Sequence, residues 1–495
     1  MDYVLGLDIS TTASKALLVD EAGTVVTVHS TPHQISQPHP MWSEQDPGEW
    51  WEAVRQSIRS VIDDADIHPA SIKGIGLTGQ MHGLVMLDSD GRVLRPAMLW
   101  NDQRASAECD EIRELVGPSQ LVQLTGNDAF AGFTAPKLLW VRKNEPEIYA
   151  RTDRVLLPKD YIRFMLTGEY ATDKSGAGGT LFLDLNARDW STEILDALDI
   201  PIKWMPETFE GTEVAGVISE TGAAETGLVA GCPVVGGGGD QAAGAVGMGA
   251  VSEEIWGLTV GTSGVVFAPT LAPVVEPQGR VHAFPHAVPG QWHLMGVMLS
   301  AAGSLSWYHD ALASRASFEE LIEEAATVES GSEGLIFLPY LSGERTPHAD
   351  SKLRGSFIGL STRHTRAHMT RAVLEGVAFG LADNFRMLQE LGLPAPSQVR
   401  LSGGGSRSPL WRQIIADVLN IELVTLKTTE GAAFGAALLA GTNAGFWPTV
   451  QVACNSAVVS ETIVRPDPEI SQLYTAQLER FRNLYPALQQ HFADS

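Results

Sequence analysis

The chain has 495 residues and a formal net charge of −25, with 44% hydrophobic and 19% charged residues. This length exceeds what one hydrophobic core supports and predicts two or more domains. The acidic balance argues against a nucleic-acid partner, because phosphate contacts need clustered Lys and Arg. No apolar run is long enough to span a bilayer, so we expect no membrane partner either.

Cysteine usage and the first residues indicate the compartment. Cys109, Cys232 and Cys454 are widely scattered, which suggests neither a disulfide framework nor a zinc site. The opening "MDYVLGLDIS" lacks the basic start and long apolar run of a secretory signal. We therefore expect a cytoplasmic protein.

The first predicted elements are strands joined by tight turns, followed by a helix. The apolar segments 3–9 and 14–20 flank a Ser/Thr-rich turn, and a β-branched run covers 24–29. After these strands, Asp46 is expected to cap a helix, with Pro47 as its first residue and Glu49 as its capping-box partner.

The turn "GQMHG" follows an apolar strand and places Gln80, Met81 and His82 between two glycines. An amide, an apolar surface and an imidazole together suit a polyhydroxylated ligand. A structural or simply exposed histidine is the alternative for His82, and the residues alone leave both open.

The same pattern begins again after residue 230. The segment "CPVVGGGGD" predicts a strand that ends in glycines at Asp240, which could be a general base, a metal ligand or a turn residue. A helical segment follows, and then "GLTVGTSGVVFAP", which matches "GLDISTTASKALLV" as strand, turn and strand. Repeated strands and helices of this kind predict an α/β protein of two similar halves with a cleft between them.

The two strand–turn–strand units are candidates for a phosphate site. No Walker motif is present, but Ser and Thr hydroxyls and free N–H groups in "STTASK" and "GTSG" can donate to phosphate oxygens. Lys15 adds a charge, and Asp8 at the end of the first strand suits a hydrated magnesium ion. Two exposed hairpins, and a turn-capping role for Asp8, are the alternatives.

The second half also carries glycines between a strand and a helix, at 403–405, where a flat ligand could lie against the backbone. A plain strand–helix connection is the alternative. The small residues of 431–441 predict a helix that serves close packing, and residues 467–488 predict a helix that packs back on the body.

These motifs, in this order, resemble the FGGY carbohydrate kinases, and within them the kinases of xylulose. The segments "GFTAPKLLWVRKNEPE" from residue 132 and "GSFIGLSTRHTRAHMTRAVLEG" from residue 355 are similar to the two signature segments of that family. "GQMHG", "PAMLWNDQR", "VLLPKDYIRFMLTGE" and "YLSGERTPH" are similar to stretches typical of its xylulose-specific members. The resemblance covers nearly the whole chain.

The resemblance implies two actin-like (ribonuclease H-like) domains with a ligand cleft between them. Residues 1–245 would carry the sugar site and the first phosphate turn. Residues 246–495 would carry the nucleotide, with the terminal helix packing back. The implied activity is ATP-dependent phosphorylation of D-xylulose with Mg²⁺, with Asp240 as base and Asp8 holding the metal through water. A ketose and ATP would be the partners, and a homodimer is compatible with the sequence.

The resemblance also implies individual site residues. The sugar-binding residues would be Gln80, Met81, His82, Trp100, Asp102 and Gln241. The ATP-binding residues would be Ser10, Thr11, Thr12, Lys15, Gly261, Thr262, Ser263, Gly303, Gly404, Gly405 and Ser408.

Two positions depart from the pattern. Ser10 stands where many relatives have Gly, so a positive φ there would strain or shift the first turn. Gln241 stands where many xylulose-specific members have Asn, which leaves another ketose or a polyol open as substrate. A non-catalytic actin-like ATPase and a sugar-binding regulator are the rivals from other classes. Neither would require "GQMHG", Asp8 and Asp240 together.

Overall fold

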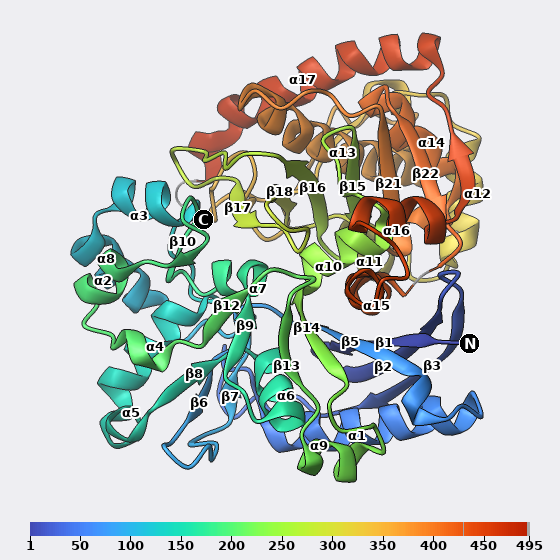
Figure 1. Ribbon diagram of the computed structural model, residues 1–495. Coiled ribbons are helices and arrows are strands. Elements are labelled where there is room, and N and C mark those ends of the chain that lie inside the picture. Colours follow the sequence, from blue (N-terminus) through green and yellow to red (C-terminus); the bar gives the residue numbers. More distant parts are fainter. Residues whose placement is uncertain (429, 493–495) are drawn as a thin grey trace.

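The computed structural model describes residues 1–428 and 430–492 and contains two large mixed β-sheets (Figure 1). The first sheet has the order β13-β14-β5-β1-β2-β3. Its strands are β1 (Tyr3–Ile9), β2 (Ala13–Asp20), β3 (Val25–Pro32), β5 (Ile72–Gly79), β13 (Val214–Val217) and β14 (Pro233–Gly239). The second sheet has the order β17-β18-β16-β15-β21-β22-β23. Its strands are β15 (Ile255–Val260), β16 (Gly264–Thr270), β17 (His282–Pro285), β18 (Trp292–Met298), β21 (Gln398–Ser402), β22 (Glu422–Leu426) and β23 (Ser460–Val464).

The two sheets repeat one pairing scheme. In the first, β1 is antiparallel to β2 and parallel to β5, and β5 is parallel to β14. In the second, β15 is antiparallel to β16 and parallel to β21, and β21 is parallel to β22. Antiparallel strands β13 and β23 complete one edge of each sheet, and β3 and β18 extend the other side. The predicted α/β fold of two similar halves is confirmed.

Both halves of the chain also contain helices. Those of the first half are α1 (Pro47–Asp64), α2 (Ser106–Val116), α3 (Pro118–Thr125), α4 (Thr134–Asn144), α5 (Pro146–Arg151), α6 (Pro158–Thr167), α7 (Lys174–Gly178), α8 (Thr192–Ala197), α9 (Glu220–Thr226) and α10 (Asp240–Met248). Those of the second half are α11 (Ala302–Leu312), α12 (Phe318–Ala326), α13 (Arg366–Glu390), α14 (Pro409–Leu419), α15 (Gly431–Asn443), α16 (Val450–Ala457) and α17 (Pro468–Phe492). None of the helices in 1–428 and 430–492 is long and apolar enough to cross a membrane.

Five two-stranded sheets complete the part of the chain that the structure describes. They pair β4 (Glu44–Gln45) with β7 (Ala97–Met98), β6 (Val85–Leu87) with β8 (Arg154–Leu156), β9 (Ala171–Asp173) with β12 (Glu207–Phe209), β10 (Leu183–Asp184) with β11 (Asp189–Trp190), and β19 (Ile336–Leu338) with β20 (Ser356–Ile358).

Helix α1 shows how local sequence signals lead to a packed element. The Asp46 side chain accepts the Gly48 N–H, and Pro47 begins the helix, as predicted. The predicted capping box is wrong, because Glu49 Oε2 instead accepts the N–H of Gln34 at 3.3 Å. The apolar face of α1, which includes the buried Trp50, packs into the core beneath the first sheet.

Helices α10 and α15 lie between the two sheets (Figure 1). Glycines permit this packing: a Cβ on Gly6 of β1 would lie 2.0 Å from the carbonyl oxygen of Ala433, and one on Gly435 would lie 1.8 Å from that of Ala243. The small-residue helix predicted for 431–441 therefore serves close packing, and it joins the second half of the chain to the first sheet.

Candidate active site

Asp240 is the first residue of α10 and directly follows the glycine end of β14. Strand β14 shifts its register with β5 between Val235 and Gly238, and Gly237 has a φ of 71°. A Cβ on Gly237 would lie 1.9 Å from the carbonyl oxygen of Leu77. Only glycine fits such a bend, and the bend carries the chain to Asp240 at the junction of strand and helix.

Asp8 and Asp240 lie close enough for the charge of one to act on the other. The pKa of Asp240 is raised to about 7, chiefly by burial and also by the carboxylate of Asp8, while hydrogen bonds from Gln241 oppose the rise. One of these bonds runs from the Gln241 N–H to Asp240 Oδ1 at 2.7 Å. Burial also raises the pKa of Asp8 to about 6, with Lys15 lowering it and Glu430 raising it. Carboxyl pairs perturbed in this way are typical of functional sites.

Asp8 meets the requirements of a magnesium ion that arrives with a nucleotide. Its Oδ1 atom is buried and has no hydrogen-bond partner among the described residues. Within 1–428 and 430–492 no group of three or more His, Cys, Asp or Glu side chains could hold a metal by itself. Mg²⁺ usually takes one or two carboxylates and completes its shell with water and phosphate oxygens. A lone carboxylate with an unpartnered oxygen fits that chemistry.

The first turn, Ser10–Thr12, is closed by Ser10 and contacts the "GQMHG" region. The Ser10 N–H and hydroxyl both donate to the carbonyl oxygen of Ala13, at 3.0 and 2.8 Å. Ser10 is not among the residues with positive φ, so the strain considered for this position does not arise. Thr11 Oγ1 accepts the Trp100 Nε1–H at 3.0 Å and donates to Gln80 Oε1 at 3.4 Å. Thr11, which was expected at ATP, thus contacts Trp100 and Gln80, which were expected at the sugar.

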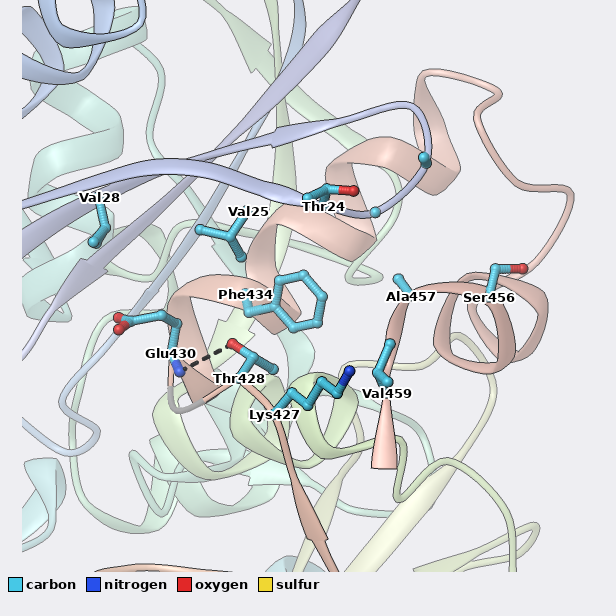
Figure 2. A pocket seen from close by; sticks show the side chains of 12 residues that line it. Thr24, Val25, Val28, Lys427, Thr428, Glu430, Phe434, Ser456, Ala457 and Val459 are labelled. Atoms are coloured by element: carbon cyan, nitrogen blue, oxygen red, sulfur yellow. Dashed lines mark hydrogen bonds between the residues drawn. The ribbon is translucent and has the colours of Figure 1, made fainter. Parts of the chain in front are cut away.

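Lys15 forms an ion pair with Glu430, the residue before α15, at 2.7 Å. Glu430 also lines a hollow of about 450 Å³ between the β2–β3 hairpin and the start of α15, together with Lys427 and Phe434 (Figure 2). Of the described residues that line this hollow, none was predicted as a site residue.

A larger cavity of about 660 Å³ opens beside Asp240 and along the second sheet. The predicted residues among those that line it are Asp240, Gln241, Gly261, Ser263 and Gly404. Gln241, expected at the sugar, therefore lies on the same cavity as the residues expected at ATP.

Thr262, Gly303, Gly405 and Ser408, also expected at ATP, are not among the residues that line this cavity. The Thr262 carbonyl accepts the N–H groups of Ala301 and Gly303 at 2.9 and 3.1 Å, which joins the second turn to the start of α11. Gly405 is buried against Val260. Ser408 Oγ caps α14 by accepting the Trp411 N–H at 3.2 Å.

Met81 and His82 do not line the large cavity, and Met81 lies beside Gly239, the residue before Asp240. The buried Met81 packs against Gly239, where a Cβ would lie 2.9 Å from Met81 Cγ. His82 has a φ of 69° and its Nδ1 lies 2.6 Å from the Gly179 carbonyl oxygen. Its ring stacks on Phe133 at 4.4 Å between centroids. Burial lowers the pKa of His82 to about 3, so the imidazole is neutral at physiological pH.

Asp102 and Trp100 differ in their surroundings. Trp100 is 49% exposed, whereas Asp102 is fully buried. Asp102 Oδ2 accepts from Arg104 Nη2 at 2.6 Å and from the Ser43 N–H at 2.7 Å, and Arg104 Nε reaches both carboxylate oxygens. The carboxylate that was expected at the sugar is thus engaged within the protein.

Sequence reasoning missed several residues around the site. Arg407 and Arg412 bring positive charge to the large cavity, and only Arg407, two residues after the glycines at 403–405, stands close to a motif in the sequence. Buried Lys137 donates to the carbonyl oxygens of His82 and Gly132 at 3.0 and 2.7 Å. The sequence could have indicated Lys137 through the segment "GFTAPK", in which a lysine stands among apolar residues.

Similarity to known proteins extends over nearly the whole chain. The models of the FGGY family of carbohydrate kinases match residues 3–247 (N-terminal domain) and 257–444 (C-terminal domain). The chain is 42% identical over 485 residues to a xylulose kinase from Escherichia coli strain K12, covering 98% of this chain and 99% of that one.

Solved structures show the same likeness. A crystal structure of a "xyloylose kinase" from Brucella ovis matches with a TM-score of 0.93 and 44% identity, and covers 99% of both chains. A gluconate kinase structure from Lactobacillus acidophilus matches with the same TM-score at 28% identity and covers 98% of both chains. The fold is thus similar to those of kinases named for two different acceptors.

Proposed function

The chain belongs to the FGGY family of carbohydrate kinases and is a sugar kinase, and on this premise we propose that it phosphorylates D-xylulose at its terminal hydroxyl. ATP would be the phosphoryl donor and Asp240 the base. The nearly full-length likeness to xylulose kinases carries this proposal. Two observations support the catalytic part of it: Asp240 lines the large cavity, and Met81 packs against the preceding Gly239.

In the proposed reaction ATP occupies the large cavity and the sugar lies on the Met81 side. Phosphoryl transfer requires in-line geometry and charge neutralisation more than a strong base. Asp240 accepts the proton of the attacking hydroxyl, and its pKa of about 7 suits this role near neutral pH. Hydroxyl and N–H groups of the two turns, with Arg407 and Arg412, offset phosphate charge.

Asp8 would hold Mg²⁺ through water, and the ion would supply neutralisation of the β- and γ-phosphate charges. The unpartnered Asp8 Oδ1 atom supports this assignment. Lys15 lies opposite Asp8 in the β1–β2 hairpin and brings a second positive charge to the same turn.

A kinase for another acceptor is the second candidate, because the gluconate kinase shares the fold at an equal TM-score. An assay of ADP release over ketopentoses, ketohexoses, polyols and gluconate separates the two. We expect D-xylulose to give a kcat/KM at least about tenfold above the others. No activity on D-xylulose with strong activity on another acceptor would refute the substrate and keep the enzyme class.

The role of Asp240 is tested by its amide variant. Asp240→Asn should reduce sugar-dependent ADP release by roughly 100-fold or more, since a positioned base contributes that much. The affinity for ATP, measured by calorimetry, should stay nearly the same. Undiminished turnover in this variant would remove Asp240 from the role of base.

A further inference from the structure

The peptide that precedes Asp240 consists of four glycines, Gly236–Gly239. Glycine has no side chain to restrict its backbone, so this segment has little rigidity of its own. A catalytic carboxylate must nevertheless be held close to its productive geometry, and a misplacement of 1 Å costs about 100-fold in rate. The structure therefore needs another source of order at this junction.

Two buried side chains hold the glycine segment from outside. Arg163, fully buried on α6, donates to the carbonyl oxygens of Val235 and Gly236, both at 2.7 Å. Ser175, 1% exposed on α7, accepts the N–H of Gly239 on its Oγ at 3.0 Å. Arg163 thus fixes the start of the glycine run and Ser175 fixes its end, one residue before Asp240.

The Ser175 hydroxyl is itself oriented by a buried ion-pair network. It donates its proton to Asp173 Oδ1, which also accepts the Gly176 N–H at 2.8 Å. Asp173 Oδ2 lies 2.5 Å from Lys159 Nζ. Because the hydroxyl proton is directed to Asp173, the oxygen presents its lone pairs to the Gly239 N–H.

Asp173, the acceptor of the Ser175 hydroxyl, favours its ionised form. Burial acts to raise the pKa of Asp173, but the Lys159 ammonium and the hydrogen bonds from Lys159, Ser175 and Gly176 outweigh it and hold this pKa below its usual value. An ionised carboxylate is a strong acceptor, so the Ser175 hydroxyl stays in one orientation.

We propose that Ser175 is a positioning residue for Asp240, which it orients through the Gly239 N–H. A hydrogen bond at this amide fixes the plane of the Gly238–Gly239 peptide and, with it, the direction in which α10 starts. Asp173 orients the Ser175 hydroxyl, and Lys159 forms a buried ion pair with Asp173. The inference rests on the proposed role of Asp240 as base, and it assigns a function to the segment "TDKSG" that no motif in the sequence suggested.

The test compares Ser175→Ala with the isosteric control Thr226→Val. Thr226 is equally buried, and its hydroxyl likewise donates to a carbonyl, Gly222 at 2.6 Å, and accepts an N–H, Leu228 at 3.3 Å. It lies on α9, and both of these hydrogen bonds are made within residues 222–228, away from the glycine run in the sequence. Both variants lose one buried hydroxyl, but only Ser175→Ala releases Gly239.

Steady-state kinetics of sugar-dependent ADP release, well below the unfolding temperature, supply the readout. We expect Ser175→Ala to lower kcat roughly tenfold or more, while the KM values for sugar and ATP change less than about threefold. Thr226→Val should keep the kcat of the wild type. A fall in kcat without a change in KM separates mispositioning of the base from a general loosening of the site.

If Ser175→Ala does not fold, Ser175→Cys is measured in its place. The thiol fills nearly the same space but accepts the Gly239 N–H only weakly. Full kcat in either folded Ser175 variant, or an equal loss in Thr226→Val, would overturn the proposal. Asp240→Asn is measured beside them on whichever acceptor the enzyme prefers. If Asp240→Asn keeps full turnover, the proposed base fails, whereas loss in Asp240→Asn with full activity in the Ser175 variants refutes the positioning role alone.

Discussion

Lys15 Nζ lies 2.7 Å from Glu430 Oε2, and this ion pair connects the β1–β2 hairpin to the start of α15. Lys15 was expected at ATP phosphate, yet part of its charge is offset by a carboxylate from the second half of the chain. The side chains are 30% and 24% exposed, so the pair is screened only in part by solvent. Glu430 also raises the pKa of Asp8.

Replacing Glu430 by Gln should therefore strengthen ATP binding. The substitution frees Lys15 for phosphate and removes a negative charge near Asp8, and an exposed pair of this kind is worth about 1 kcal/mol or less. We expect the KM for ATP to fall by roughly two- to fivefold. Asp2→Asn, which breaks the exposed pair Lys73–Asp2, is the control and should leave this KM unchanged. A KM for ATP that rises in Glu430→Gln would contradict the prediction.

The pH dependence of kcat/KM should show an acid limb near pH 7. Asp240 must be ionised to accept a proton, and its pKa is raised to about 7, so activity falls as pH drops through this value. His82, with a pKa of about 3, is neutral throughout and does not contribute. Since Asp8 and Asp240 interact, the limb belongs to the pair.

Asp8→Asn tests the origin of this limb. Removal of the neighbouring negative charge should shift the limb to lower pH even though kcat falls. Asp417→Asn is the control: burial raises the pKa of Asp417 too, but this residue lies on α14 and lines a different hollow. A limb that stays in place in Asp8→Asn would show that the two carboxylates do not interact as described.

The fold could be predicted well because its signals are local or repeated. The strands on either side of the two Ser/Thr-rich turns are short apolar runs, and the resemblance between the runs predicted the two similar sheets. Glu49 shows the limit of such signals. Its spacing from Asp46 suited a capping box, but a contact with Gln34 from another segment takes its carboxylate.

The candidate site could be predicted only where a motif marked it. Asp240 follows a glycine run, and Arg407 follows another, so both positions carry a local signal. Ser175 carries none, because its partner Gly239 is 64 residues away and the contact exists only after folding. Asp102 lies in a segment typical of the family, yet the burial of its side chain and of its partner Arg104, two residues on, carries no signal in the sequence.

Asp102 gives a prediction that separates stability from binding. Asp102→Asn leaves the buried Arg104 guanidinium with Glu44 as its remaining carboxylate, at 2.8 Å. Breaking a buried pair costs about 3–5 kcal/mol, so we expect a clear loss of stability to urea and little change in the KM for sugar at low temperature. Asp90→Asn breaks the exposed pair with Arg92 and should cost less than about 1 kcal/mol. A raised sugar KM with unchanged stability would make Asp102 a sugar contact instead.

The raised pKa of Asp240 also predicts how stability depends on pH. The folded protein keeps this proton up to about pH 7, whereas an ordinary carboxyl has a value of 3.8. Below about pH 4 the wild type is therefore as stable as a variant with an amide at this position. As pH rises to about 7, the free energy of unfolding of the wild type falls relative to that of the variant. Above about pH 7 the difference between the two stays constant.

Thermal unfolding of Asp240→Asn measures this difference. We expect the midpoint of the variant to exceed that of the wild type at pH 8 and to converge with it near pH 4. Asp88→Asn should show the opposite trend. Hydrogen bonds from the Arg92 and Asp90 N–H groups help lower the pKa of Asp88, so the wild type loses its advantage there as pH falls. A difference for Asp240→Asn that is equal at pH 4.5 and pH 8 would contradict the raised pKa, and with it the acid limb near pH 7.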